Sequence, residues 1–206
     1  MAGRMARVAI LASGEGTNAE RLIQAAQERP DVEVVCVACN RPDAGVLSRA
    51  KALGTPAWTF GRQALASGEL QRRLETSGVE FVALAGFLLK VPSSLVKSFS
   101  GRMLNLHPSL LPAFGGKGMY GRHVHVAVAE ALQRGEVDRT GITLHWVTEE
   151  FDEGAAFFQA EVGLDAHADT AESIAGKVTE LEAQYYAPQV LRAIAQSLSL
   201  SGNPKV

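Results

Sequence analysis

Cysteine is scarce in this sequence, which has two among its 206 residues, Cys36 and Cys39 in VVCVACN. A redox-active C-x-x-C pair requires a helix N-terminus to lower the pKa of one thiol, and a zinc site requires more ligands than this stretch offers. The two thiols instead lie in a β-branched run, three residues apart and therefore on opposite faces of a strand. We expect both cysteines to be buried and inert.

Long hydrophobic runs are also lacking. The longest, FVALAGFLL at 81–89, is far shorter than the about 20 apolar residues that cross a bilayer. The N-terminal MAGRMARVAILASGEG carries arginines before an apolar stretch, as a signal peptide does, but that stretch is short and runs into a Gly-rich turn. A first β-strand after a loose extension at 1–6 is the better interpretation, and the cytoplasm is the expected compartment.

The sequence also lacks an excess of positive or negative charge. The formal net charge is -2 at pH 7, so no basic field attracts nucleic acid or an anionic membrane. An anionic ligand must therefore be met by a local site. The length favours a single domain over residues 1–206, with monomer and homodimer both left open.

The order of secondary structure indicates an α/β fold. RVAILAS at 7–13 precedes the amphipathic NAERLIQAAQER, and VEVVCVACN at 32–40 precedes DAGVLSRAKALG. This βαβ rhythm, with nearly continuous apolar strands, predicts a Rossmann-like, mostly parallel sheet with helices on both faces. Residues 140–164 predict a C-terminal antiparallel hairpin folded about DEG. A last helix follows a capping box of Asp169 and Glu172, and 199–206 form a loose tail.

A Gly-rich turn, ASGEGTNAERL, follows the first predicted strand. The glycines are explained most simply by a tight turn. They also fit the relaxed dinucleotide pattern G-x-G-x-x-A, but Asn40 and Arg41 stand where a ribose-binding acid is needed, and no Walker lysine follows. A third interpretation is an anion nest, in which the N–H groups of Gly16 and Thr17, with the Thr17 hydroxyl and the Asn18 amide, bind one phosphate group.

A histidine ends the predicted strand GRMLNLH. Asn105 and His107 are two residues apart and therefore point to the same side, at the carboxyl end of a strand where open α/β sheets bind ligands. A partly buried structural histidine is the simpler alternative. Asp152, at the predicted hairpin tip, is expected to raise the pKa of this imidazole from about 6.5 if the hairpin folds over the crevice.

The other histidines carry weaker signals. His123 and His125 have a spacing that suggests metal binding, but no third ligand is near, and we expect the surface start of a helix and no metal. His145 is expected to pack within a strand or to support the site from behind. His167 is expected in an exposed loop.

Four stretches together resemble a known family. NLHPSLLPAF at 105–114, with SGEGTN before it, LAGFLLKV at 84–91 and TGITLHWVTEEFDEG after it, resembles the phosphoribosylglycinamide formyltransferase family, the ribonucleotide branch of the folate-dependent formyl transferases. The resemblance runs from Val8 to about Leu191, in the family's motif order. It implies formyl transfer from 10-formyltetrahydrofolate to the amine of glycinamide ribonucleotide in purine biosynthesis.

The resemblance also implies residue roles. Asn105, His107 and Asp152 match the catalytic residues. Gly16, Thr17, Asn18 and Glu182 match the ribonucleotide site. The expected folate contacts are Arg62, Leu88, Leu89, Lys90, Val91, Asn105, Thr148, Glu149, Glu150, Phe151 and Asp152.

The sequence departs from the family in the loop Gly115–His123, at Lys90, where many relatives carry Arg, and at the proline of EAQYYAPQ, which stands one residue late. The alternatives are a tRNA-directed formyl transferase, a formyl-folate hydrolase, a dinucleotide-dependent oxidoreductase and a nucleotide sensor without catalysis. The first two usually carry a further domain, for which this length leaves no room.

Overall fold

The computed structural model describes residues 5–201, and its centre is a seven-stranded sheet in the order β3-β2-β1-β4-β5-β6-β7. Strands β1 to β5 run parallel, whereas β5–β6 and β6–β7 pair antiparallel. The expected parallel sheet with a C-terminal hairpin is therefore confirmed. The strands are β1 Ala6–Ala12, β2 Val32–Cys39, β3 Ala57–Thr59, β4 Phe81–Ala85, β5 Met103–His107, β6 Arg139–Trp146 and β7 Ala156–Gly163.

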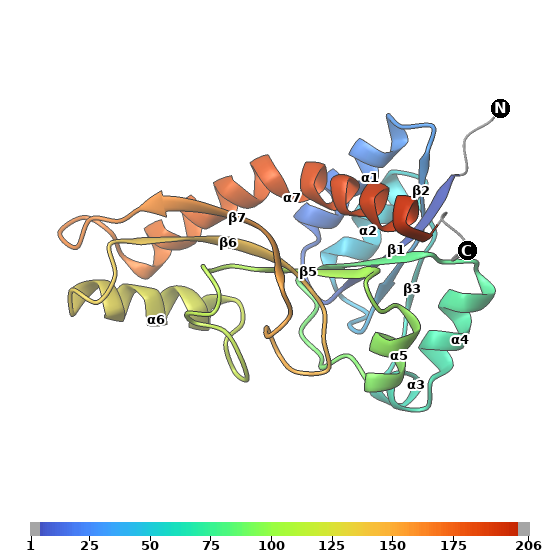
Figure 1. Ribbon diagram of the computed structural model, residues 1–206, viewed down its shortest axis with the longest axis horizontal. Coiled ribbons are helices and arrows are strands. Elements are labelled where there is room, and N and C mark those ends of the chain that lie inside the picture. The colour runs from blue at the N-terminus through green and yellow to red at the C-terminus, as the bar shows by residue number, and fades with distance from the viewer. Residues whose placement is uncertain (1–4, 202–206) are drawn as a thin grey trace.

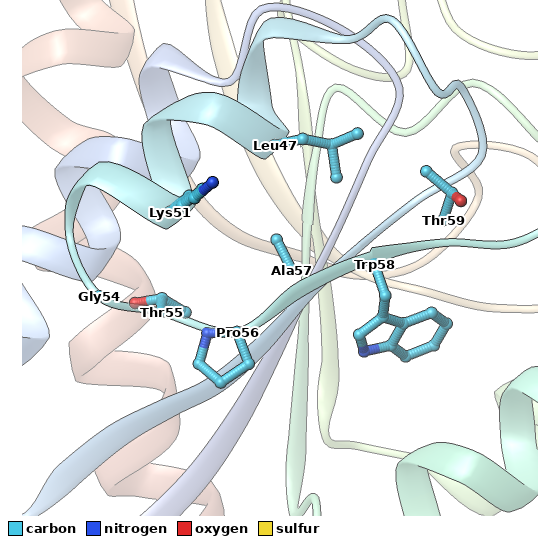
Figure 2. Close-up of a pocket in the computed structure, with 8 residues that line it drawn as sticks. All are labelled: Leu47, Lys51, Gly54, Thr55, Pro56, Ala57, Trp58 and Thr59. Atoms are coloured by element: carbon cyan, nitrogen blue, oxygen red, sulfur yellow. The ribbon is translucent and has the colours of Figure 1, made fainter.

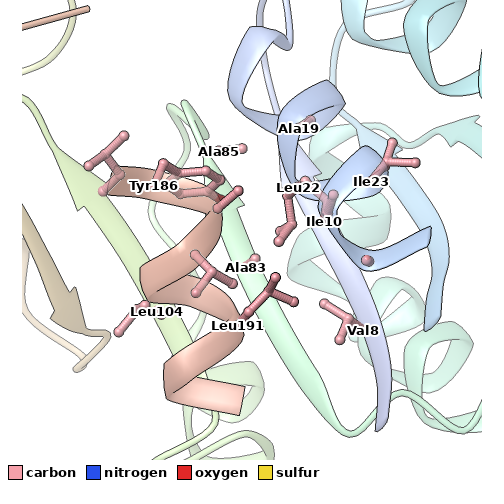
Figure 3. Packing of buried hydrophobic residues seen from close by; sticks show 14 of the residues in the cluster. Val8, Ile10, Ala19, Leu22, Ile23, Ala83, Ala85, Leu104, Tyr186 and Leu191 are labelled. Atoms are coloured by element: carbon pink, nitrogen blue, oxygen red, sulfur yellow. The ribbon is translucent and has the colours of Figure 1, made fainter. Parts of the chain in front are cut away.

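Helices cover both faces of the sheet (Figure 1). Alternate residues of β1 enter two different apolar clusters: Val8 and Ile10 pack with α1, α2 and α7 (Figure 3), whereas Ala9 and Leu11 pack with α3, α4 and α5. Burial on both faces explains the nearly unbroken apolar character of this strand. The helices are α1 Thr17–Gln27, α2 Gly45–Ala52, α3 Arg62–Ala66, α4 Glu69–Thr76, α5 Ser93–Ser98, α6 Arg122–Gln133 and α7 Ala171–Ser201.

The two cysteines lie as expected. Both are free and buried, Cys36 in the cluster beneath α4 and Cys39 in the cluster beneath α1. Burial raises the pKa of the Cys36 thiol to about 11, which keeps it protonated and unreactive at neutral pH.

Several expected boundaries need correction. Ala6 is fully buried and begins β1, so the loose extension is shorter than 1–6, and α7 continues through Ser201 into the expected tail. The rest of those two segments, 1–4 and 202–206, lies outside the described residues. The short helix α3, which contains Arg62, was not expected.

The cap of α7 also differs from the expected one. Thr170 and Ser173 exchange hydrogen bonds, each hydroxyl accepting from the other's backbone N–H at 3.3 and 2.9 Å. Asp169 lies just before this turn, and its carboxylate accepts from Lys177 Nζ at 2.6 Å. The expected box of Asp169 and Glu172 is therefore wrong by one residue, because Asp169 is engaged by a lysine eight positions along the chain.

The strand order changes direction between β1 and β4, and open α/β sheets bind ligands at such a point. Strand β1 pairs with β2 on one side and with β4 on the other, so the following connections lead away in opposite directions and leave a crevice at the carboxyl ends. The buried Ser13 fastens this edge: its hydroxyl donates to Asn40 Oδ1 at 2.5 Å and accepts from the Leu88 N–H at 2.9 Å. The ends of β1, β2 and β4 are thus held in one frame.

Within residues 5–201, no helix is both long enough and apolar enough to cross a membrane.

Candidate active site

The Gly-rich turn ends β1 and begins α1, as its pattern predicts. Gly16 is the N-cap of α1 with φ 80° and ψ 23°, a left-handed conformation that only glycine adopts readily. Thr17 is the first helical residue, and its side chain is exposed. The first N–H groups of a helix have no acceptor within that helix, so this turn presents backbone donors and the positive end of the helix dipole to the crevice.

Gly16 is required for a second reason, because a Cβ there meets the backbone and side chain of Val46 at the start of α2. We expect Gly16→Ala to shift α2 away from the turn and to lower the melting temperature by several degrees. Gly14→Ala is the matched control, since a Cβ on Gly14 meets nothing within 4 Å. Differential scanning calorimetry of both variants is the measurement. Equal melting temperatures for the two would contradict this account of Gly16.

The Asn18 side chain points inward. Its amide nitrogen donates to Glu182 Oε2 at 2.8 Å, across 164 residues of sequence, and its oxygen accepts from Arg21 Nη1 at 3.3 Å. Burial raises the pKa of Glu182, and the Asn18 hydrogen bond opposes that shift. The structure therefore brings together the residues expected at the ribonucleotide site. One N–H of the Asn18 amide is thus engaged within the protein, and the exposed Thr17 hydroxyl and the first backbone N–H groups of α1 are further donors at this turn.

The expected catalytic residues also come together. Asn105 and His107 lie at the carboxyl end of β5, two strands from β1 in the same parallel set. Asp152 lies in the connection between β6 and β7, which folds back over that end of the sheet. Its Oδ2 is 3.5 Å from His107 Nδ1 and accepts from the Gly116 N–H at 2.9 Å. Asp152 has a left-handed backbone conformation, with a φ of 57°.

The hydrogen-bond partners of His107 indicate which of its ring nitrogens carries hydrogen. Nε2 lies 2.8 Å from the Phe114 carbonyl, which can only accept, so Nε2 carries hydrogen and Nδ1 is the basic nitrogen facing Asp152. In this conformation neither ring nitrogen faces open space, and His107 is 3% exposed. The Nε2–H therefore reaches a reacting oxygen only when its bond to the Phe114 carbonyl opens.

The expected direction of the His107 pKa is wrong. Burial lowers this pKa below its ordinary value, and the Asp152 carboxylate opposes the shift without reversing it. For Asp152 the balance differs: burial acts to raise its pKa, but the imidazoles of His145 and His107 and the Gly116 N–H outweigh it and hold the pKa below the usual range. Asp152 is thus an anion at neutral pH beside a mostly neutral imidazole.

His145 is closer to the site than its sequence context indicates. Its Nδ1 lies 3.2 Å from the Trp146 carbonyl, so Nε2 is free to accept from Asn105 Nδ2 at 3.0 Å, and that same nitrogen is 3.5 Å from Asp152 Oδ1. The support expected of His145 thus takes the form of direct contact with two candidate catalytic residues. Its pairing with Asn105 across β5 and β6 was not readable from either segment alone.

The H-x-H pair is not wholly at the surface. His123 is exposed and packs its ring against Tyr120, but His125 is half-buried, because α6 packs against α7 through Val124 and Val128. Burial and the proximity of His107 both lower the pKa of His125. His167 is exposed, as expected. Across residues 5–201 no cluster of three or more His, Cys, Asp or Glu side chains is arranged to hold a metal ion.

The two segments expected to line the folate pocket touch each other. Lys90, after β4, lies 3.4 Å from Glu150 and 5.4 Å from the centre of the Phe151 ring. Leu88 and Phe151 are 45% and 38% exposed, so each of the two segments presents apolar surface to solvent here. Val91 is buried, whereas Leu89 is only partly covered.

The remaining expected folate residues lie around these two. Thr148 and Glu149 are exposed beside Glu150, and Glu149 lies 3.4 Å from Lys97 Nζ. Arg62 is exposed at the start of α3, two residues beyond Phe60, whose ring lies 6.1 Å from that of Phe87. Their roles in folate binding stay predictions.

Two cavities differ in their relation to these residues. One of about 500 Å³ is lined by Asp152 and Phe151, together with Leu111, Pro112, Gly115, Gly116, Glu153, Gly154 and Ala156, and so adjoins the candidate site. Another, of about 570 Å³, lies at the opposite edge of the sheet beside β3 and α2, around Lys51 and Trp58 (Figure 2). None of the expected site residues lines that second cavity, so its size does not make it the active site.

The sequence and the fold of this chain both match known proteins. A family model described as "Formyl transferase" matches residues 6–191. The chain belongs to the formyl transferase family. It is 37% identical over 200 residues to the chloroplastic phosphoribosylglycinamide formyltransferase of Arabidopsis thaliana, covering 94% of this chain and 66% of that relative.

A second relative and a solved structure show the same similarity. The phosphoribosylglycinamide formyltransferase of Bacillus subtilis is 33% identical, with 92% of this chain and 95% of that relative covered. The crystal structure of phosphoribosylglycinamide formyltransferase from Anaplasma phagocytophilum superposes with a TM-score of 0.81 at 32% identity, covering 94% of this chain and 89% of that one. The resemblance of the sequence motifs and the expected formyl transferase fold are thus confirmed.

Proposed function

We propose that this formyl transferase moves the formyl group of 10-formyltetrahydrofolate to the primary amine of glycinamide ribonucleotide, a step of purine biosynthesis. The observation that carries the proposal is the convergence of a carboxamide, an imidazole and a carboxylate at the end of β5, beside a backbone anion site at the end of β1. Relatives that bear this activity in their names align with nearly the whole chain. The chain acts as a single domain.

The ligands occupy the edge formed by the ends of β1, β4 and β5. The phosphate binds the N–H groups of Gly16 and Thr17, and Glu182 faces the ribonucleotide from α7. The folate ring lies between the Leu88–Val91 segment and the hairpin connection at 148–152. This arrangement directs the amine and the formyl carbon toward Asn105.

The reaction is a direct attack. The amine adds to the formyl carbon and gives a tetrahedral intermediate with a negatively charged oxygen. One N–H of Asn105 is held by His145, and the other donates to that oxygen. His107 adds a second donor when its Nε2–H leaves the Phe114 carbonyl. Neither cysteine is needed, since no covalent intermediate with the enzyme forms.

Proton movement is assigned to Asp152. As an anion bordering the cavity, it accepts a proton from the attacking amine through a water and returns it to the departing folate nitrogen. When Asp152 carries this proton, its O–H can donate to the basic Nδ1 of His107, which lies 3.5 Å from Oδ2. The enzyme uses two small-molecule substrates and needs no metal, nucleic acid or membrane. It works in the cytoplasm, as a monomer or a homodimer.

The test is a formyl-transfer assay with purified protein, glycinamide ribonucleotide and 10-formyltetrahydrofolate, followed by the absorbance of the deformylated folate. We expect turnover that requires both substrates. Folate cleavage at the same rate without ribonucleotide would indicate a hydrolase and reject the proposal. No turnover despite binding of both ligands would indicate a sensor.

A further inference from the structure

The phosphate turn is supported from behind by α2. The N–H of Val46 donates to the Gly14 carbonyl at 3.2 Å, and Val46 packs against Gly16 so closely that no side chain fits there. A Cβ on Gly45 would meet the Glu15 side chain. The first turn of α2 therefore fixes the backbone of the turn from Gly14 to Gly16 (Figure 1 shows α1 and α2 as neighbours).

Arg49, one turn further along α2, is the charged member of this support. Its Nε donates to the Glu15 carbonyl at 2.9 Å, and its Nη1 pairs with Glu20 Oε2 at 2.5 Å. A planar guanidinium can hold two acceptors in a fixed relation, which an ammonium cannot do. Arg49 thus clamps the residue before the N-cap of α1 to the first turn of the same helix.

Arg49 also affects the charge around the turn. The turn that receives an anion carries two acids, Glu15 and Glu20, which both oppose a phosphate there. The Arg49 side chain is 36% exposed and that of Glu20 is 30% exposed, so their pairing is partly shielded from solvent. Without Arg49, the Glu20 carboxylate lies uncompensated in the first turn of the helix that binds the phosphate.

We propose that Arg49 is a positioning residue for the ribonucleotide phosphate: it holds the Glu15 carbonyl so that the Gly16 and Thr17 N–H groups face the crevice, and it neutralises Glu20. The inference rests on the proposed function and adds to it a residue that does not touch substrate. It assigns to α2, which contributes none of the expected site residues, a part in discriminating phosphorylated from unphosphorylated acceptors.

The experiment compares glycinamide ribonucleotide with its dephosphorylated riboside in wild type and Arg49→Gln. We expect Arg49→Gln to raise KM for the ribonucleotide about tenfold, because the unpaired Glu20 charge then repels the phosphate at close range, while kcat and the folate KM stay within about twofold. KM for the riboside should not change. Adding Glu20→Gln to Arg49→Gln should recover part of the loss, since it removes the repulsive charge, and Arg49→Lys should lie between.

The matched control is Arg29→Gln, which removes an arginine of similar exposure that pairs with Asp31 just beyond the other end of α1. It should change neither KM. An unchanged ribonucleotide KM in Arg49→Gln, or an equal rise with the riboside, would overturn the inference, because a merely structural role affects both acceptors alike. If the wild type transfers no formyl group, the proposed function fails, and calorimetric binding of the same two acceptors to the same variants still decides the role of Arg49.

Discussion

Asp152→Asn should lower kcat by about 10²–10³-fold with little change in folding, since it removes the carboxylate that relays the proton. Asparagine has the same shape, and it tolerates the left-handed backbone that Asp152 adopts at φ 57°. Its side-chain oxygen still accepts from the Gly116 N–H, so the hairpin connection stays in place. What is lost is a negative charge 3.5 Å from each of His107 and His145.

The pH profile should change in a defined direction. Asp152 raises the pKa of His107 against the larger effect of burial, so its removal lowers that pKa further. Protonated His107 is the stronger donor to the developing oxyanion, so wild-type kcat falls as the pH rises through this pKa, and in Asp152→Asn the same fall begins at a lower pH. Steady-state kinetics between about pH 5 and 9 measure this shift around the His range.

The control for this experiment is Glu153→Gln. Glu153 is the neighbouring exposed acid of the same connection and lines the same cavity. It should retain turnover within about threefold, because an exposed charge is largely screened. Near-wild-type kcat in Asp152→Asn, with saturating folate and ribonucleotide, would refute the assignment of proton transfer to Asp152. So would an equal loss in the two variants.

Much of this site was predictable because its signals are local. Apolar runs such as 81–85 read as buried strands, and the spacing of Asn105 and His107 places both at one strand end. A Gly-rich turn between a strand and a helix makes an anion site one of the interpretations that the sequence offers, beside a plain tight turn. The position of Asp152 at a hairpin tip was visible too, although its distance from His107 was not.

What the sequence did not reveal depends on contacts between distant segments. The Asn18–Glu182 hydrogen bond joins α1 to α7, and the Asn105–His145 contact depends on the register of β5 and β6. The direction of the His107 pKa was missed for a related reason. A neighbouring acid can be guessed from sequence, but the degree of burial that opposes it follows only from complete packing.

Asn105→Ala should lower kcat by about 10²–10³-fold, because it removes the hydrogen-bond donor aimed at the developing oxyanion. The intact amide is oriented before substrate arrives: one of its N–H groups is bound to His145 Nε2, which fixes the direction of the other. An interaction that strengthens only in the transition state affects kcat and leaves KM nearly unchanged. KM for both substrates should therefore stay within about threefold.

Asn40→Ala serves as the matched control, since Asn40 is another strand-end amide, bonded to Ser13 at the end of β2. Its removal leaves Ser13 without that acceptor and should lower the melting temperature more than it lowers kcat. In Asn105→Ala the order is reversed, with a large loss of turnover and a small loss of stability. If both variants lose turnover in proportion to their melting temperatures, Asn105 supports the fold of the strand end and does not stabilise the oxyanion. A kcat loss confined to Asn105→Ala, in protein that melts like wild type, places the reacting oxygen at the end of β5.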